Sequence, residues 1–259
     1  MPTSIVNGAN LYYETAGQGE PLVFIHGLGS STRDWEYQVA AFASDYRVIA
    51  VDLRGHGQSD KPEGPYSIHL FVSDLVGMLG ELGVTAAHLV GISLGGAVAF
   101  QLAIDRPAMV RTLTVVNGSP HLPATLEEAK QGVDRRVRLV RQYGMRALGQ
   151  ALVSNLLPAP EHAIRREEFV DRWAENDPDA FIEATRSTLF WDVTDQLGSI
   201  QCPVLIIAAE QDYTPVSFKE SYLGLLPHAE LAVIAGAHHA VPIECPEEFN
   251  AVLARFLAR

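Results

Sequence analysis

Cysteine is scarce in this sequence, because its 259 residues include only Cys202 and Cys245. Two cysteines this far apart in the chain are too few for a structural zinc site or for a disulfide framework. We therefore expect both to be reduced residues that serve in packing. Nothing in the sequence indicates a bound metal ion.

Positive charge is also in short supply. The 19 Lys and Arg residues are outnumbered by 31 Asp and Glu residues, which gives a formal net charge of −12 at pH 7. A negatively charged protein is repelled by phosphate backbones and by anionic lipid, and the basic residues form no dense run along the chain. We expect neither nucleic acid nor a membrane as a partner.

Long apolar segments, internal repeats and tracts of Pro, Gly or Ser are missing as well. No apolar run reaches the roughly 18 residues that indicate a membrane span, and the start of the chain, MPTSIVNGAN, lacks the features of a signal peptide. With 47% hydrophobic and 19% charged residues, the composition is that of a globular protein. We expect a soluble, cytoplasmic protein, and the sequence does not indicate its oligomeric state.

What the sequence does contain is an alternation of short apolar runs with helical patterns. Six runs are nearly continuous in apolar residues, which is typical of parallel strands buried on both faces. They span residues 21–26, 46–52, 87–93, 110–117, 203–210 and 230–236. Helical spacing of apolar residues occurs over 31–43 and 67–82, and a last helix begins near Pro246. This alternation predicts an α/β fold with a mostly parallel, doubly wound sheet.

One region breaks the alternation. Residues 119–198 contain several helical patterns but no convincing strand, and this length is far more than an ordinary crossover between strands needs. We predict that this region is a helical cap inserted into the α/β core, which then consists of residues 1–118 and 199–259. We expect the cap to cover the carboxyl ends of the strands, where open α/β sheets bind ligands.

The segment GISLGG, residues 91–96, follows a predicted strand and begins a helix rich in small residues. Its first five residues fit the pattern G-x-S-x-G, a sharp turn from strand to helix that projects the serine hydroxyl above the sheet. Glycine is needed on either side because a β-carbon would crowd the strained turn. The pattern predicts that Ser93 is a nucleophile.

A serine hydroxyl becomes nucleophilic when a base accepts its proton and a carboxylate orients that base. Asp212 lies two residues beyond the predicted strand 203–210, on the rim where ligands bind. Its competitor Glu210 is expected to end the strand or to bond a loop. The base would come from His238 or His239, which are adjacent and precede the last predicted helix.

Acyl transfer also needs donors for the negative charge that develops on the carbonyl oxygen. The glycine-rich loop HGLGSS, residues 26–31, follows a predicted strand and can bring backbone amides close to a ligand. The N–H groups of Leu28 and Leu94 are our candidates for this oxyanion hole. His26 lies within the same loop, and we expect it to fix the loop's shape through backbone hydrogen bonds.

These segments occur in an order and at a spacing that resemble the α/β-hydrolase superfamily over nearly the whole chain. They are HGLGSS, DLRGHGQSD (52–60), GISLGG, AEQD (209–212) and the segment around His239. Within the superfamily, the sequence looks most like the capped carboxylesterases and 3-oxoadipate enol-lactonases. The resemblance implies a serine hydrolase that needs no cofactor and cleaves a small carboxylic ester or lactone through an acyl-enzyme. It also implies Ser93 as nucleophile, Asp212 as orienting acid and His239 as base, with His238 left to solvent or the cap.

Two departures from related families narrow the reaction. Ser93 stands where haloalkane dehalogenases and the related epoxide hydrolases have an aspartate, so those reactions are disfavoured. Ala240 stands where hydrolases of carbon–carbon bonds usually have a tryptophan, which makes that activity less favoured but leaves it open. A small-molecule sensor or a partner of a signalling protein also stays open, because fold and triad alone do not define a function.

The cap is expected to select the substrate. Its predicted apolar lining consists of Phe181, Leu189, Phe190 and Trp191, and Trp191 fits the interior of the cap equally well. Three cap arginines, Arg135, Arg138 and Arg141, could clamp an acidic lactone. An apolar stripe on the same helix, formed by Val133, Val137 and Val140, favours instead that these arginines face solvent.

Overall fold

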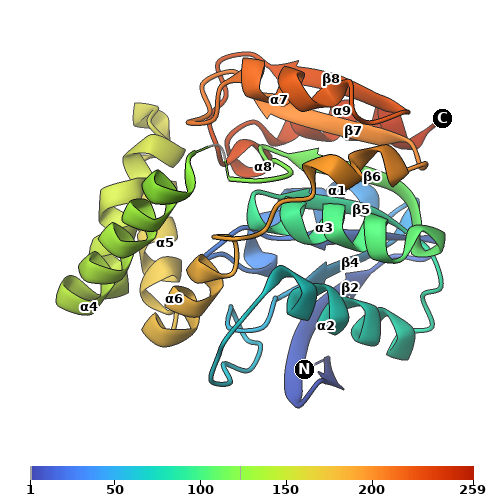
Figure 1. Ribbon diagram of the computed structural model, residues 1–259. Coiled ribbons are helices and arrows are strands. Elements are labelled where there is room, and N and C mark those ends of the chain that lie inside the picture. Colours follow the sequence, from blue (N-terminus) through green and yellow to red (C-terminus); the bar gives the residue numbers. More distant parts are fainter. Residues whose placement is uncertain (1, 123) are drawn as a thin grey trace.

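The computed structural model describes residues 2–122 and 124–259, and its centre is a sheet of eight strands within these ranges (Figure 1). The spatial order is β1-β2-β4-β3-β5-β6-β7-β8. In chain order the strands are β1 (Thr3–Val6), β2 (Ala9–Ala16), β3 (Glu20–Ile25), β4 (Tyr46–Val51), β5 (Ala87–Ile92), β6 (Val110–Val116), β7 (Val204–Ala209) and β8 (Ala229–Ile234). Strands β3 to β8 pair in parallel, and they are the six strands predicted from the apolar runs. The α/β fold class is thereby confirmed.

Strands β1 and β2 were not predicted. They form an antiparallel hairpin, and β2 continues the sheet by pairing antiparallel with β4. Their turn consists of Asn7 and Gly8, which both have positive φ, at 47° and 74°. An Asn-Gly pair between two short strands is a strong hairpin signal, because both residues tolerate this backbone conformation.

Helices cover both faces of the sheet (Figure 1). The helices of the core are α1 (Glu36–Phe42), α2 (Ile68–Glu81), α3 (Leu94–Asp105), α7 (Val216–Leu223), α8 (Val241–Glu244) and α9 (Pro246–Leu257). Successive residues of a strand point to opposite faces. Accordingly, Val23 of β3 packs in the cluster that contains Phe71 of α2, whereas its neighbour Phe24 packs with Trp35 and with Phe249 of α9. The sheet is therefore doubly wound, as expected.

Between β6 and β7 the chain forms helices α4 (Leu126–Leu156), α5 (Ala163–Ala174) and α6 (Pro178–Arg186), which lie to one side of the sheet layers (Figure 1). These helices share an apolar cluster of their own, which includes Trp173 and Phe181. The cluster also takes in Ala240 and Ile243, which come from the segment before α9. We propose the division that the sequence predicts, with core segments 1–118 and 199–259 and a cap over 119–198.

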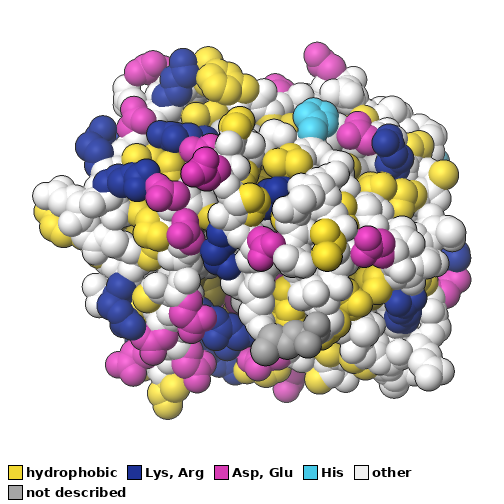
Figure 2. Space-filling model, turned by 90° about the horizontal axis from the view of Figure 1, so that it is seen from below, with side chains coloured by type: hydrophobic (Ala, Val, Ile, Leu, Met, Phe, Trp, Pro, Cys, Tyr) yellow, Lys and Arg dark blue, Asp and Glu magenta, His cyan; other side chains and the backbone are white. Residues whose placement is uncertain are grey.

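The charged side chains of both signs are interspersed over the face seen in Figure 2. No helix within the described part of the chain is long and apolar enough to cross a membrane. The cytoplasmic location remains a prediction.

Candidate active site

Ser93 lies at the turn between β5 and α3, with φ 54° and ψ −113°. Positive φ is costly for a residue with a side chain, so this turn is strained. The flanking glycines allow it. A β-carbon on Gly91 would lie 2.2 Å from the carbonyl oxygen of Gly95, and one on Gly95 would lie 2.1 Å from that of Ile25. The glycines of G-x-S-x-G are therefore required by close backbone contacts.

Asp212 and His239 are brought together by the carboxyl ends of β7 and β8. The distance from His239 Nδ1 to Asp212 Oδ1 is 2.7 Å, and the carboxylate is fully buried. Asn117, at the end of β6, holds both loops in place. Its side-chain amide donates to the carbonyl of His239 at 3.0 Å, and its oxygen accepts the N–H of Ala209 at 2.8 Å. Asn117 was not singled out in the sequence.

The second oxygen of Asp212 binds a buried lysine. Lys219 Nζ lies 2.7 Å from Asp212 Oδ2, and neither side chain is exposed. The hydroxyl of Thr214 donates to the same oxygen. Burial alone would raise the pKa of Asp212, but the hydrogen bond and charge of His239, with the bonds from Lys219 and Thr214, lower it below its usual value. Burial lowers the pKa of Lys219, against the opposing effect of Asp212.

His238 keeps 24% of its side chain exposed, and its ring also binds a carboxylate that the sequence did not predict. Its Nδ1 lies 2.8 Å from Oε1 of Glu244, and the same carboxylate accepts the backbone N–H of His238. The reason is the short helix α8, which returns Glu244 to the loop before it. The two neighbouring histidines thus bind different carboxylates, and the one bound to Asp212 is His239.

Glu210 and His26 have the structural roles expected of them. Glu210 follows β7 and accepts the backbone N–H of Gly236 at 2.8 Å. His26 is fully buried, and its Nε2 accepts the N–H of Leu53 at 3.0 Å. Burial lowers the pKa of His26 to about 4, so its ring stays neutral and fixes the loop.

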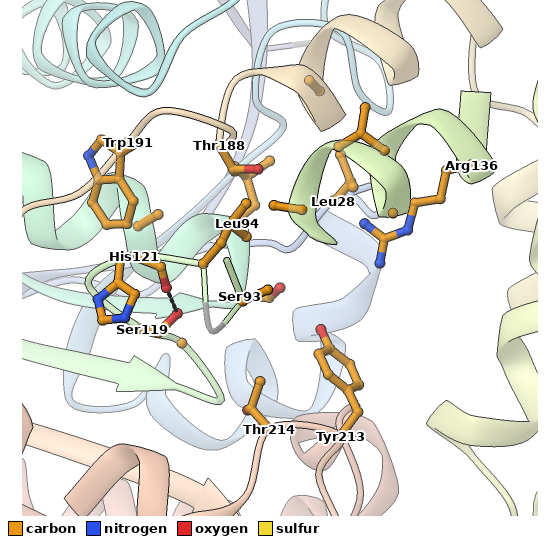
Figure 3. A pocket seen from close by; sticks show the side chains of 18 of the residues that line it. Leu28, Ser93, Leu94, Ser119, His121, Arg136, Thr188, Trp191, Tyr213 and Thr214 are labelled. Carbon is orange, nitrogen blue, oxygen red and sulfur yellow. Dashed lines mark hydrogen bonds between the residues drawn. The ribbon is translucent and has the colours of Figure 1, made fainter. Parts of the chain in front are cut away.

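Tyr213 lies between the serine and the histidine and was missed in the sequence. Its hydroxyl is 2.9 Å from His239 Nε2, and the two ring centroids are 4.3 Å apart with an interplanar angle of 31°. Figure 3 shows the hydroxyl directed toward Ser93. Within the described residues, no hydrogen bond joins Ser93 to His239.

Two cavities of about 530 and 320 Å³ meet at Ser93, beneath the cap. The residues that line both are Leu28, Ser93, Arg136, Leu152 and Tyr213. His239 lines the smaller cavity, and His121 lines the larger one. Arg136 extends from α4 into this region (Figure 3), and it lies on the same side of the helix as the buried residues Val133 and Val140. The helical spacing of Arg136 from Val133 and Val140 could have predicted this position from the sequence.

The predicted apolar lining divides into two pairs. Phe181 lines the smaller cavity, and Trp191 lines the larger one while its Nε1 donates to Gln101 at 2.8 Å. Leu189 and Phe190 are not among the described residues that line either cavity. Phe190 is 76% exposed with its ring near the Lys130 ammonium, because the turn after α6 directs it outward.

The candidate oxyanion amides lie beside the serine. Leu94 is the first residue of α3, so its N–H has no acceptor within the helix. Leu28 lines both cavities with Ser93, and a β-carbon on the preceding Gly27 would lie 3.5 Å from Ser93 Cβ. The loop and the turn are therefore in close contact. No group of three or more His, Cys, Asp or Glu side chains in the described ranges could hold a metal ion.

Comparison with known proteins agrees with this fold. Residues 22–252 match the model of the alpha/beta hydrolase family, and the chain belongs to this family. It is 32% identical over 257 residues to 3-oxoadipate enol-lactonase 2 of Acinetobacter baylyi, covering 95% of this chain and 94% of the relative. It is 30% identical over 262 residues to a putative carbamate hydrolase, RutD, of Azorhizobium caulinodans, covering 99% and 98%. The enol-lactonase of Burkholderia xenovorans has the same fold, with a TM-score of 0.94, 24% identity and full coverage of both chains.

Proposed function

We propose that this protein is a serine hydrolase that cleaves a small carboxylic ester or lactone through an acyl-enzyme. The observation that carries the proposal is the pair of His239 and Asp212, joined at 2.7 Å and facing a cavity that Ser93 also lines. The similarity to a lactonase over nearly the whole chain supports this substrate class.

In this reaction, Ser93 Oγ attacks the carbonyl carbon while its proton passes to His239 Nε2. Asp212 orients the imidazole and stabilises the imidazolium that forms. The N–H groups of Leu28 and Leu94 donate to the developing oxyanion. The proton then passes to the departing alkoxide, and water, activated by the same histidine, releases the acid from Ser93.

The two cavities suit a substrate with groups on both sides of its carbonyl. Ser93 lies where they meet, so an acyl group can occupy one cavity and the alcohol portion the other. Phe181 and Trp191 give each cavity an aromatic wall. We expect these residues to contact substrate, and we no longer expect Leu189 or Phe190 to do so.

The test is Ser93→Ala, measured by hydrolysis of p-nitrophenyl butyrate and by labelling with a fluorophosphonate. We expect both reactions to be abolished in a protein that melts like the wild type. Undiminished labelling of the variant would exclude the serine mechanism. A panel of esters, lactones, carbamates and ring-cleavage products then distinguishes ester or lactone hydrolysis from the other reactions, and absence of turnover on all of them favours a sensor.

A further inference from the structure

The hydroxyl of Tyr213 is hydrogen-bonded to Nε2 of His239, the nitrogen that accepts the proton of Ser93 in the proposed mechanism. A neutral imidazole has one N–H and one acceptor nitrogen. Since Nδ1 of His239 faces Asp212, the nitrogen left to accept a proton is Nε2, and the group 2.9 Å from it is the Tyr213 hydroxyl. The base is therefore engaged before any substrate is bound.

The surroundings of Tyr213 allow its hydrogen bond to His239 to be replaced by one from Ser93. The residue lies in the loop between β7 and α7, is 62% exposed and lines both cavities beneath the cap. Because its ring lines both cavities, a ligand that fills either one must contact it. Ser93 lines the same two cavities, and the phenol hydroxyl is directed toward it (Figure 3), so the serine is placed to replace the phenol once the ring moves away.

We infer that Tyr213 holds His239 in a resting arrangement, from which bound substrate displaces the phenol so that Ser93 Oγ takes its place on Nε2. Tyr213 is thus a positioning residue that delays activation of the serine until the cavity is filled. This inference rests on the proposed function. A relay, in which the serine proton would reach the histidine through the phenol, is the opposite role and predicts the opposite effect of removing the hydroxyl.

The experiment compares Tyr213→Phe with the wild type and with Tyr143→Phe. Tyr143 is equally exposed at 62%, lies on the cap helix α4 and is absent from the described lining of both cavities, so it controls for the same chemical change. Two reactions are measured: kcat/KM for p-nitrophenyl butyrate, and the second-order rate of labelling of Ser93 by a fluorophosphonate.

We expect Tyr213→Phe to raise both rates by the same factor, about two- to tenfold, because each reaction starts from the resting enzyme and must break one hydrogen bond. The control should stay within the error of the wild type. A fall of both rates by about a hundredfold would overturn the inference in favour of a relay, and unchanged rates would overturn it outright.

The proposed function can fail separately from this inference. A wild type that is inert while Tyr213→Phe turns over would support the inference in its strongest form. If neither protein reacts with ester or fluorophosphonate, the proposed function and the inference are both excluded. Normal turnover by the wild type with slower reactions in Tyr213→Phe excludes the inference alone.

Discussion

In the core, Ser93 and Asp212 follow β5 and β7, which are buried along their whole length, and His239 follows β8, which is mostly half-buried. Buried partners such as Lys219 hold the site further. In the cap, the side chains that line the cavities come from amphipathic helices with many exposed charges, among them Arg141 paired with Asp179. Rigid strands give the core the precision that proton transfer requires. We expect the core to carry out the reaction and the cap to select the substrate, with the two regions coupled where the cap packs on Ala240 and Ile243.

The largest expected effect tests the core. His239→Ala should lower kcat by about three to six orders of magnitude, because the base that accepts the serine proton is lost. His238→Ala is the matched control, since its imidazole binds Glu244 instead of Asp212, and it should cost about tenfold or less. Both are measured as turnover of p-nitrophenyl butyrate in folded variants. The reverse ranking would move the base to His238.

The next effect concerns the stability of the core. Lys219→Met leaves the Asp212 carboxylate without its cation, and breaking a buried pair costs about 3–5 kcal/mol of unfolding free energy. Urea unfolding at pH 7 measures the loss. The exposed Lys130→Met should change stability by about 0.5 kcal/mol or less. If Lys219→Met lost no more unfolding free energy than Lys130→Met, the Lys219–Asp212 pair would make no net contribution to stability.

The same pair should show a defined pH dependence. The folded-state pKa of Asp212 is lowered, so its stabilising contribution is present above the unfolded value and is lost as pH falls through the folded one. The difference in stability between wild type and Lys219→Met should therefore narrow in acid, below the ordinary aspartate range. A difference that widened there would contradict the lowered pKa.

Substitution of Arg136 tests whether the cap selects by charge. Arg136 extends into the region where the two cavities meet, so we expect it to favour a substrate that carries a carboxylate. Arg136→Met should reduce kcat/KM for the p-nitrophenyl monoester of glutaric acid by about ten- to a hundredfold, and much less for the neutral butyrate. Arg138→Met is the control, because Arg138 lies on the same helix but is not among the described residues that line either cavity. Equal losses on both esters would exclude charge selection.

The smallest effect separates two neighbouring aromatic residues of the cap. Trp191 lines the larger cavity, whereas the Phe190 side chain is exposed. Trp191→Ala should change the preference among acyl chains of two to eight carbons by about a few-fold, since each added methylene contributes about 0.8 kcal/mol when buried. Phe190→Ala should leave the ranking unchanged. If both variants kept the wild-type ranking, the larger cavity would not hold the acyl chain.

The sequence was most informative where one physical requirement dominates. The parallel strands were predicted because burial on both faces, which is most complete in β5 and β7, demands continuous apolar runs. Ser93 was predicted because close backbone contacts require the glycines on either side of it. The hairpin β1-β2 is short and one-sided, so its apolar content gave little signal, although Asn7 and Gly8 marked the turn. Phe190 was misplaced because composition alone does not tell which side of a turn a residue faces.

Tyr213 and Lys219 could not be predicted from the sequence, for a different reason. Their importance comes from contacts across the loop after β7, with His239 and with Asp212, and no spacing in the sequence specifies such contacts. Arg136 was closer to prediction, since it lies three residues after Val133 and four before Val140 on one face of α4. A charged residue on an apolar face is a signal worth testing in any cap helix.

The apolar cluster of the cap has a consequence for protein engineering. It includes Ala240 and Ile243, which follow His239, the proposed base, in the chain. A chimaera that received the cap of a relative would therefore have to import matching residues at these two positions as well. Without matching residues, poor packing under the foreign cap would displace the imidazole of His239, which directly precedes Ala240. A graft intended to change the substrate would then lower the rate for every substrate alike.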